Sequence, residues 1–279
     1  MKVLITGGKG LLGRSIVPPL SERFDCAVYD IDEWDITSAA AGEKMLGRHR
    51  PDVLLNLAAM TDVDGCEENT ALAERSNVEG PAVLAGLCEA FHVRLIHIST
   101  DYVFDGTKRL PYREDDEPNP RSVYGRTKLA GEKKILDRNI DWVIIRTEWL
   151  YGHSGSSFVD KVVAIAQSQG FARVVNDQQG SPTYARDLAL PVSAIIEKGL
   201  TGIYHISNSG SCTWYDFAKA IFLTLRMDID VFPISSADLA RKAERPSYSV
   251  FDLTKLSRDT GIAMRNWRTA LTDYLSGEF

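Results

Sequence analysis

The sequence predicts an α/β fold, a doubly wound parallel sheet followed by a smaller C-terminal lobe. Short apolar runs alternate with segments of helical spacing over residues 1–150, as in parallel strands that helices cover on both faces. Glycines crowd the turn after the first run, and polar side chains end the fourth run. Both features lie where a doubly wound sheet forms its ligand crevice.

The strands of this sheet are expected at short runs rich in aliphatic and β-branched residues. Two prolines interrupt the first helical segment, and a proline inside a helix predicts a kink or an early end there. The expected strands are Lys2–Thr6, Cys26–Asp30, Val53–Ala58, Arg94–Thr100 and Trp142–Thr147, and the expected helices are Leu11–Arg23, Ala39–Arg50, Ala71–Phe91 and Ser122–Arg138.

After residue 150 the pattern changes to turns rich in glycine and serine, with shorter strands between helices. We expect residues 1–150 to form the sheet domain, with a later strand near 203–207 rejoining it. Residues 151–279 would form mainly the smaller lobe. Its expected elements are the helices Phe158–Gln169, Arg186–Lys198 and Thr213–Leu225 and the strands Arg173–Asn176 and Ile203–Ile206.

Composition excludes several classes of protein. The net charge of -6 gives no support to binding of nucleic acid or membrane surfaces, which usually shows a basic patch. No apolar run reaches the length of a membrane span, and the first residues do not resemble a secretory signal. The four cysteines are scattered and do not cluster with histidines. We therefore expect a cytoplasmic protein without a metal site.

The glycine-rich turn at Gly7, Gly10 and Gly13 predicts a dinucleotide site of the Rossmann type. Glycines allow a tight turn and let a pyrophosphate approach backbone N–H groups at a helix N-terminus. Asp30 ends the second expected strand, where a carboxylate can accept from the adenosine ribose and favours NADH. Lys9 favours NADPH because a cation can bind the 2′-phosphate. The choice between NADPH and NADH stays open.

Two tyrosine–lysine pairs have a spacing of four, Tyr124 with Lys128 and Tyr215 with Lys219. On a helix this spacing puts both side chains on one face, where an ammonium can help a tyrosine act as a general acid. Tyr124 opens a helix soon after the strand that ends at Thr100, beside the expected crevice. We therefore predict that Tyr124 is the acid and that Tyr215 is a core or interface aromatic.

The order of these motifs resembles the extended short-chain dehydrogenase/reductases, and finer features resemble one branch, the dTDP-4-dehydrorhamnose reductases. The shared segments cover Met1 to about Trp267. They are TGGKGLLG, DITS, the Asn56–Ala59 run, STDYVFDG, VYGRTKLAGEK, RTEWLYG, NDQQGSPTYARDLA and RPSYSVFDLTKL.

The resemblance implies an oxidoreductase that uses NADPH or NADH to reduce the C4 ketone of a dTDP-linked 4-keto-6-deoxy sugar, giving dTDP-L-rhamnose. Tyr124 would donate the proton, Thr100 would hydrogen-bond the developing alkoxide, and Lys128 would hold the nicotinamide ribose. A homodimer is compatible with the sequence. Further cofactor-binding residues would be Gly7, Gly10, Leu11, Leu12, Gly13, Asp30, Asp35, Ile36, Ala58, Ala59 and Ser99, and sugar-binding residues Thr61, Tyr102, Trp149 and Arg186.

Three other functions occur in proteins that resemble this chain. Related 4,6-dehydratases carry Asp and Glu directly after the threonine, but here Tyr102 follows Asp101. Another nucleotide-sugar reductase or an epimerase stays open, as does a partner-binding protein like the regulatory subunit of methionine adenosyltransferase.

Relatives often have Gly-x-Asn-Phe where this chain has Ser157 before Phe158. Arg245 and Arg186 are candidates to bind the diphosphate of the nucleotide sugar.

Overall fold

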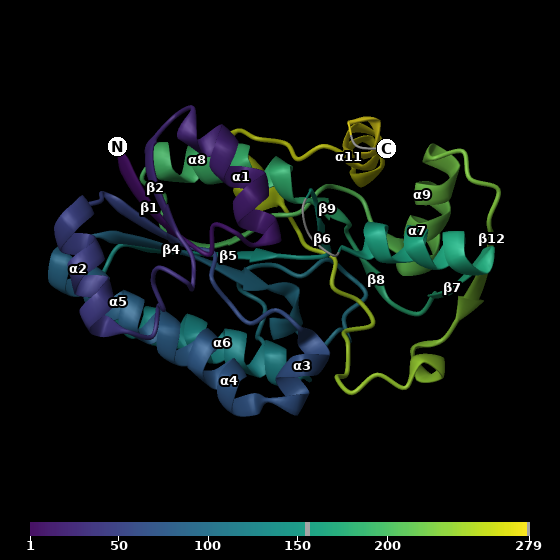
Figure 1. The fold of residues 1–279 in the computed structure, drawn as a ribbon, viewed down its shortest axis with the longest axis horizontal. Helices are drawn as coiled ribbons and strands as arrows, with labels where there is room; N and C mark the ends of the chain where they lie inside the picture. Colours follow the sequence, from purple (N-terminus) through teal and green to yellow (C-terminus); the bar gives the residue numbers. More distant parts are fainter. Residues whose placement is uncertain (154–156, 278–279) are drawn as a thin grey trace.

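A parallel sheet forms the centre of the protein (Figure 1). The computed structural model describes residues 1–153 and 157–277. The strand order is β10-β5-β4-β3-β1-β2, and each neighbouring pair is parallel, which confirms the predicted fold class. The strands are β1 (Lys2–Thr6), β2 (Asp25–Tyr29), β3 (Val53–Asn56), β4 (Arg94–Thr100), β5 (Trp142–Thr147) and β10 (Gly202–His205).

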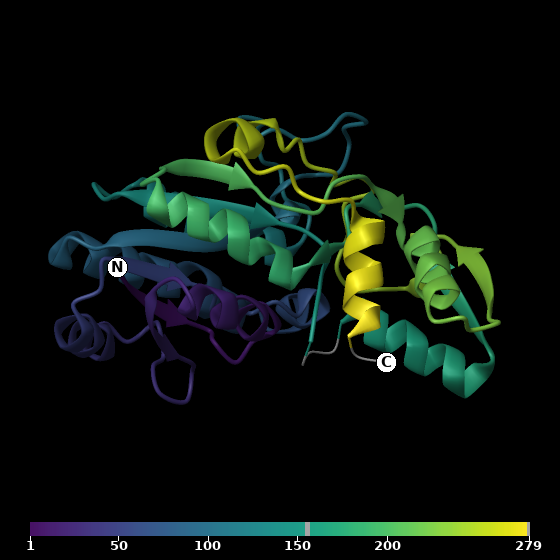
Figure 2. The ribbon, with the colours of Figure 1, turned by 90° about the horizontal axis from the view of Figure 1, so that it is seen from above.

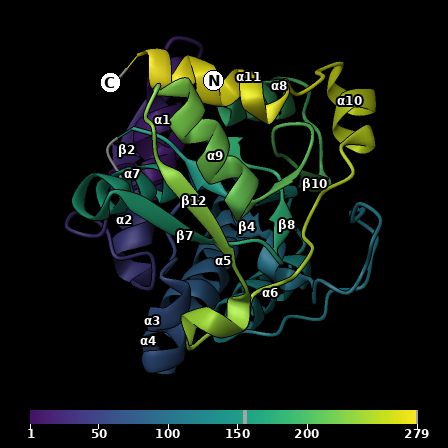
Figure 3. The same cartoon turned by 90° about the vertical axis from the view of Figure 1, so that its right-hand side faces the viewer.

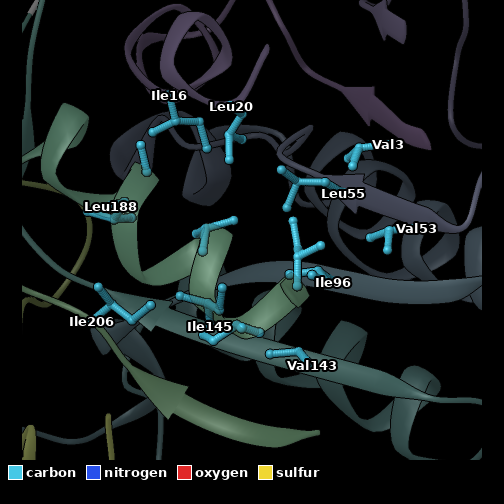
Figure 4. Close-up of a cluster of buried hydrophobic side chains, with 14 of the residues drawn as sticks. Val3, Ile16, Leu20, Val53, Leu55, Ile96, Val143, Ile145, Leu188 and Ile206 are labelled. Atoms are coloured by element: carbon cyan, nitrogen blue, oxygen red, sulfur yellow. The ribbon is translucent and has the colours of Figure 1, made fainter. Parts of the chain in front are cut away.

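Helices cover both faces of this sheet (Figures 1 and 2). Apolar side chains from the strands fill the space beneath each helical layer, and Figure 4 shows the cluster under one of them. The burial of this apolar surface is the main force that holds the layers together. One layer contains α1 (Leu11–Ser21) and α8 (Ala189–Glu197), and the other contains α2 (Ala39–His49), α5 (Gly80–Phe91) and α6 (Val123–Leu136).

Three of the expected helices differ in the structure, and the last of them, expected at Arg186–Lys198, is divided into the 3-10 turn Ala185–Leu188 and α8. The first runs through Pro18 and Pro19 to Ser21, so an early end was wrong. Ile16 and Leu20 are fully buried around the prolines, and their packing holds the helix in place despite the lost backbone hydrogen bonds.

The segment expected as one helix over Ala71–Phe91 is divided. It contains α4 (Thr70–Glu74), a π-helical turn (Arg75–Glu79) and α5, and α3 (Val63–Glu68) precedes it. The turn carries Asn77 inward, where its side chain bonds both backbone groups of Met60 at 2.9 and 3.0 Å. Such turns are frequent at functional sites, and this one borders the hollow described below.

The smaller lobe lies beyond the carboxyl ends of the central strands (Figures 1 and 3). Its own apolar core joins three helices to a parallel strand pair. The elements of this pair and core are β7 (Phe171–Val175), β12 (Asp230–Ile234), α7 (Phe158–Gln169), α9 (Trp214–Thr224) and α11 (Trp267–Ser276). The remaining elements are the pairs β6 (Leu150–Tyr151) with β9 (Thr183–Tyr184) and β8 (Gln179–Gly180) with β11 (Cys212–Thr213), the helix α10 (Thr254–Thr260), and 3-10 turns at Asp101–Val103, Ala185–Leu188 and Ser236–Leu239.

Membrane-spanning helices are absent from the described part of the chain, because each helix there is too short or too polar to cross a bilayer.

Candidate active site

The carboxyl ends of β4 and β5 open into a hollow of about 430 Å³ between the sheet and the smaller lobe. Thr100 and Thr147 end the two strands as register partners. Tyr124 and Lys128 line the same hollow from α6, and Phe158 and Trp214 line it from the lobe. The structure therefore brings the three predicted catalytic residues together in one place.

Helix α6 approaches β4 closely because of a glycine. A Cβ on Gly125 would lie 2.1 Å from the carbonyl oxygen of Tyr102, so no other residue fits there without a shift of the backbone. The helix begins at Ser122, whose hydroxyl accepts from the Gly125 N–H at 3.1 Å. These two features hold the first turn of α6, with Tyr124, against the end of the strand.

Burial dominates the electrostatics of Tyr124 and Lys128. It raises the pKa of the Tyr124 phenol, and a hydrogen bond with Thr100 opposes this shift. It lowers the pKa of Lys128 to about 8, against the attraction of Glu132. Burial favours the neutral form of each group. Tyr124 is therefore a phenol that can give a proton, and Lys128 titrates close to neutral pH.

Two buried carboxyl groups lie beside Thr100. Thr100 Oγ1 donates to Asp101 Oδ1 at 2.9 Å, and the backbone N–H of Ser181 donates to Glu148 Oε2 at 2.8 Å. Burial raises the pKa of Asp101 to about 6. Burial and the Asp101 charge raise the pKa of Glu148 well above its ordinary value. Burial therefore favours the protonated forms of both groups relative to ordinary carboxyl groups.

A second hollow, of about 460 Å³, adjoins the first along the glycine-rich turn, and both are lined by Gly10, Leu57 and Ala59. Gly7 has a φ of +73°, and a Cβ there would lie 2.6 Å from the Ala58 nitrogen. Helix α1 begins at Gly10 with no side-chain cap among the described residues. Its first N–H groups are thus open to an anion, as a pyrophosphate site needs.

An aromatic stack forms the lobe side of the site. Trp149 and Trp214 lie parallel with ring centroids 3.5 Å apart, and Phe158 packs on Trp214 at 4.5 Å. Trp149 has a φ of +47°, which is uncommon for a residue with a side chain. Strain of this kind persists only where the surroundings hold it in place. This stack presents flat apolar surface opposite the polar strand ends.

Most of the predicted site residues line one of the two hollows. The first hollow is lined by Gly10, Leu11, Leu12, Ala59, Thr61, Ser99, Thr100, Tyr102, Tyr124, Lys128 and Trp149, and the second by Gly7, Gly10, Asp30, Asp35, Ile36, Ala58 and Ala59. Gly13 lines neither, but a Cβ there would lie 2.5 Å from the Gly8 carbonyl oxygen. It therefore shapes the turn by allowing close packing.

Arg186 is not brought to either of these hollows. It lines a separate one between α1, α8 and the chain before α11. This placement does not support the prediction that Arg186 contacts the sugar nucleotide. The sequence could not show this, because it does not indicate in which direction a side chain on a short 3-10 turn points. The Arg245 guanidinium forms an ion pair with the Asp64 carboxylate, with Nη2 and Oδ2 2.8 Å apart.

The serine that replaces the usual asparagine is already engaged. Ser157 borders the first hollow, but its hydroxyl donates to Asp160 at 2.6 Å as part of the N-terminal cap of α7. A hydrogen bond from the Ser157 hydroxyl to a ligand would therefore compete with this bond. Gly155 and Ser156 of the same motif lie outside the described residues.

Sequence reasoning missed several residues that line the site. Glu148 comes directly after β5 as Asp101 comes after β4, so the rule about strand ends could have found it. Trp214 and Phe158 carry no local signal, because they reach the hollow only through packing of the lobe. Among the described residues, no group of three or more His, Cys, Asp or Glu side chains gathers to hold a metal ion.

Comparison with known proteins shows similarity to one family over almost the whole chain. The family model described as "RmlD substrate binding domain" matches residues 1–278. The dTDP-4-dehydrorhamnose reductase of Streptomyces griseus is 42% identical, and the match covers 97% of this chain and 91% of that protein. The Mycobacterium tuberculosis protein of the same name is 40% identical, with 99% and 92% covered.

Solved structures match over nearly the whole length. A dTDP-4-dehydrorhamnose reductase from Bacillus anthracis in complex with NADP has a TM-score of 0.95 at 35% identity, covering 99% of each chain. A dTDP-4-dehydrorhamnose reductase from Clostridium acetobutylicum has a TM-score of 0.96 at 40% identity, also covering 99% of each chain. UDP-glucose 4-epimerase of Thermus thermophilus, at 21% identity and a TM-score of 0.83, covers 100% of each chain and shares the fold.

Proposed function

Because the chain belongs to the family of the RmlD substrate binding domain, we propose that it is an NAD(P)H-dependent dTDP-4-dehydrorhamnose reductase. It would reduce the C4 ketone of dTDP-4-dehydro-6-deoxy-L-mannose to give dTDP-L-rhamnose. The observation that carries this proposal is the joint placement of Thr100, Tyr124 and Lys128 in a hollow that shares lining residues with the one at the glycine-rich turn. Relatives named for this activity match almost the whole chain.

We assign cofactor binding to residues 1–150 with β10, and substrate binding mainly to residues 151–279. The open N-terminus of α1 would bind the pyrophosphate. Asp30, Asp35 and Ile36 border the second hollow and would hold the adenosine half. Lys128 would hold the nicotinamide ribose in the first hollow. When bound, the reduced nicotinamide would supply the hydride for the ketone carbon.

The protein's own groups would handle the developing negative charge on the ketone oxygen. Tyr124 would give its phenolic proton to that oxygen, and the Thr100 hydroxyl would hydrogen-bond it. Both groups are fixed by packing before the substrate arrives, and donors of fixed geometry stabilise such charge most effectively. Thr100 donates to Asp101 without substrate, so it must turn this hydrogen toward the ligand.

The sugar would lie between the strand ends and the lobe. Thr61, Tyr102 and Trp149 line this part of the hollow. All of these groups come from one chain. We place the reaction in the cytoplasm, where nicotinamide cofactors and nucleotide sugars occur.

The other functions have less support. A 4,6-dehydratase needs a second acid/base pair, but here Tyr102 takes the place of the glutamate after Asp101. Burial also raises the pKa of Glu148, the other carboxyl group near Thr100. A purely partner-binding role would not require the buried catalytic trio. Reduction of another nucleotide sugar is the alternative with the most support, because a Streptomyces antibioticus relative at 43% identity is named a probable 4-ketoreductase of a different dTDP sugar.

The test is an assay of the purified protein with NADPH or NADH and dTDP-4-dehydro-L-rhamnose, following absorbance of the reduced nicotinamide. We expect oxidation of the cofactor and formation of dTDP-L-rhamnose. A panel of other 4-keto nucleotide sugars, run in parallel, measures the sugar preference. No oxidation with either cofactor and any sugar of the panel would refute the proposed reductase.

A further inference from the structure

A chain of buried polar side chains runs beneath the site. Thr6, Asn56, His97 and Lys128 come from β1, β3, β4 and α6, and each is at most 2% exposed. Thr6 Oγ1 lies 2.7 Å from Asn56 Oδ1, Asn56 Nδ2 lies 2.9 Å from His97 Nδ1, and His97 Nε2 lies 3.3 Å from Lys128 Nζ. Buried polar groups of this kind must match donors to acceptors along the whole chain.

One backbone group fixes the polarity of this chain. The N–H of Ala58 can only donate, and it lies 3.1 Å from Asn56 Oδ1. This atom is therefore the amide oxygen, and the amide nitrogen faces His97 Nδ1. An amide nitrogen donates and does not accept. His97 Nδ1 must therefore accept, and a neutral His97 carries its hydrogen on Nε2.

That hydrogen points at Lys128. Burial and the nearby Lys128 charge lower the pKa of His97 well below its ordinary value, so the ring is neutral. A lysine ammonium has no lone pair, whereas a neutral amine can accept. Lys128 Nζ meanwhile donates to the Ile98 carbonyl at 2.6 Å, which both forms can do. The His97 Nε2–H therefore disfavours the ammonium form of Lys128, whereas it can donate a hydrogen bond to the neutral amine form.

The other charged and titratable groups around Lys128 do not cancel this preference. Glu132, on α6, favours the ammonium. Its carboxylate is shared, however, with Arg146 of β5 at 2.7 and 3.1 Å and with the Ser99 hydroxyl. Tyr124, from the first turn of α6, is held as a neutral phenol.

We propose that His97 is a positioning residue whose tautomer, fixed by Asn56, favours the neutral amine of Lys128 over the ammonium. Lys128 then gives up its ammonium proton near neutral pH, which an ordinary lysine does only near pH 10. The tautomer can be measured without any substrate. The inference rests on the proposed function only for its effect on the reduction rate.

The first test is long-range proton–nitrogen NMR of the full-length protein labelled at histidine nitrogens, without cofactor or substrate. His97→Gln identifies the His97 signals. We expect a neutral ring with its hydrogen on Nε2 from pH 6 to pH 9. A hydrogen on Nδ1, or a charged ring, overturns the proposal whatever the activity of the protein.

The second test reverses the tautomer. In Asn56→Asp a carboxylate accepts from Nδ1–H, so His97 Nε2 becomes an acceptor for the ammonium. We expect the alkaline limb of kcat/KM to move up by about one pH unit or more. His97→Gln, whose side-chain oxygen can accept, should move it in the same direction if the aspartate variant fails to fold.

The matched control is His205→Gln. His205 is equally buried but lies on β10 and contacts the Tyr112 carbonyl at 3.0 Å. Its substitution should leave the alkaline limb where it is. An unmoved limb in both Asn56→Asp and His97→Gln, or an equal shift in the control, would overturn the proposal.

Discussion

The two tyrosine–lysine pairs of this chain share their spacing and differ in their surroundings. Tyr124 and Lys128 lie on α6 and are buried, the lysine only 2% exposed. Tyr215 and Lys219 lie on α9, where the lysine is exposed and its Nζ is 5.2 Å from the tyrosine ring centroid. The shared spacing places the members of each pair next to each other, but only the first pair lies at a strand end and is buried.

Proximity to the hollow does not by itself explain why the two tyrosine–lysine pairs differ. Trp214 lines the hollow from the start of α9, yet the next residue, Tyr215, packs against the core of the lobe. Successive helical residues point about 100° apart, so one side chain can reach the site while the next turns away. The proposed chemistry therefore depends on orientation as well as on position.

The largest expected effect distinguishes Lys128 from Lys219. Lys128→Met should lower kcat by about 10³-fold, because the positioned nitrogen next to the proposed acid, which would hold the nicotinamide ribose, is lost. Lys219→Met removes the same charge from an exposed site and should leave kcat unchanged. Steady-state rates of nicotinamide oxidation measure both. Equal losses in the two variants would mean that burial does not distinguish the pairs.

The next effect concerns the hydroxyl partner of Tyr124. Thr100→Val removes a fixed hydrogen-bond donor at the developing alkoxide and should lower kcat by about 10²-fold. Thr100→Ser keeps the hydroxyl and should retain most of the activity. A valine variant as active as the serine variant would remove Thr100 from the proposed mechanism.

The smallest effect lies at the far end of the cofactor. Asp30→Ala should raise the preference for NADPH over NADH by several-fold, since a carboxylate repels a 2′-phosphate. Asp30 also accepts from the N–H groups of Lys9 and Ile31, each at 2.8 Å, so some loss of affinity for both cofactors is expected.

Asp32→Ala is the matched control for the Asp30 prediction. It removes one charge from an exposed residue that pairs with Lys9 but is not among those lining the hollow. The ratio of kcat/KM for the two cofactors is measured for each variant. An unchanged ratio in Asp30→Ala would show that Asp30 does not contact the ribose.

The central sheet was predictable from the sequence because its signals are local. Buried parallel strands are short apolar runs, and the glycine-rich turn has its own pattern. Tyr124 could be chosen over Tyr215 because it follows β4 along the chain. These residues are close to the strand ends in sequence as well as in space.

The rest of the site depends on contacts that no local pattern records. The π-helical turn at Arg75–Glu79 forms around Asn77 and Met60, which are far apart in sequence. Trp214 reaches the hollow through the packing of the lobe, and Arg186 turns to another face. The proposed effect of His97 on Lys128 depends on the backbone N–H of Ala58, which follows the neighbouring strand β3.

The most direct test of the account compares Tyr124→Phe with Tyr215→Phe. Each change removes one phenolic hydroxyl from a tyrosine that lies four residues before a lysine. With dTDP-4-dehydro-L-rhamnose and reduced cofactor, we predict that Tyr124→Phe loses most of kcat and that Tyr215→Phe keeps it. Full activity in Tyr124→Phe, or loss in Tyr215→Phe alone, would contradict the assignment of the site to the end of β4.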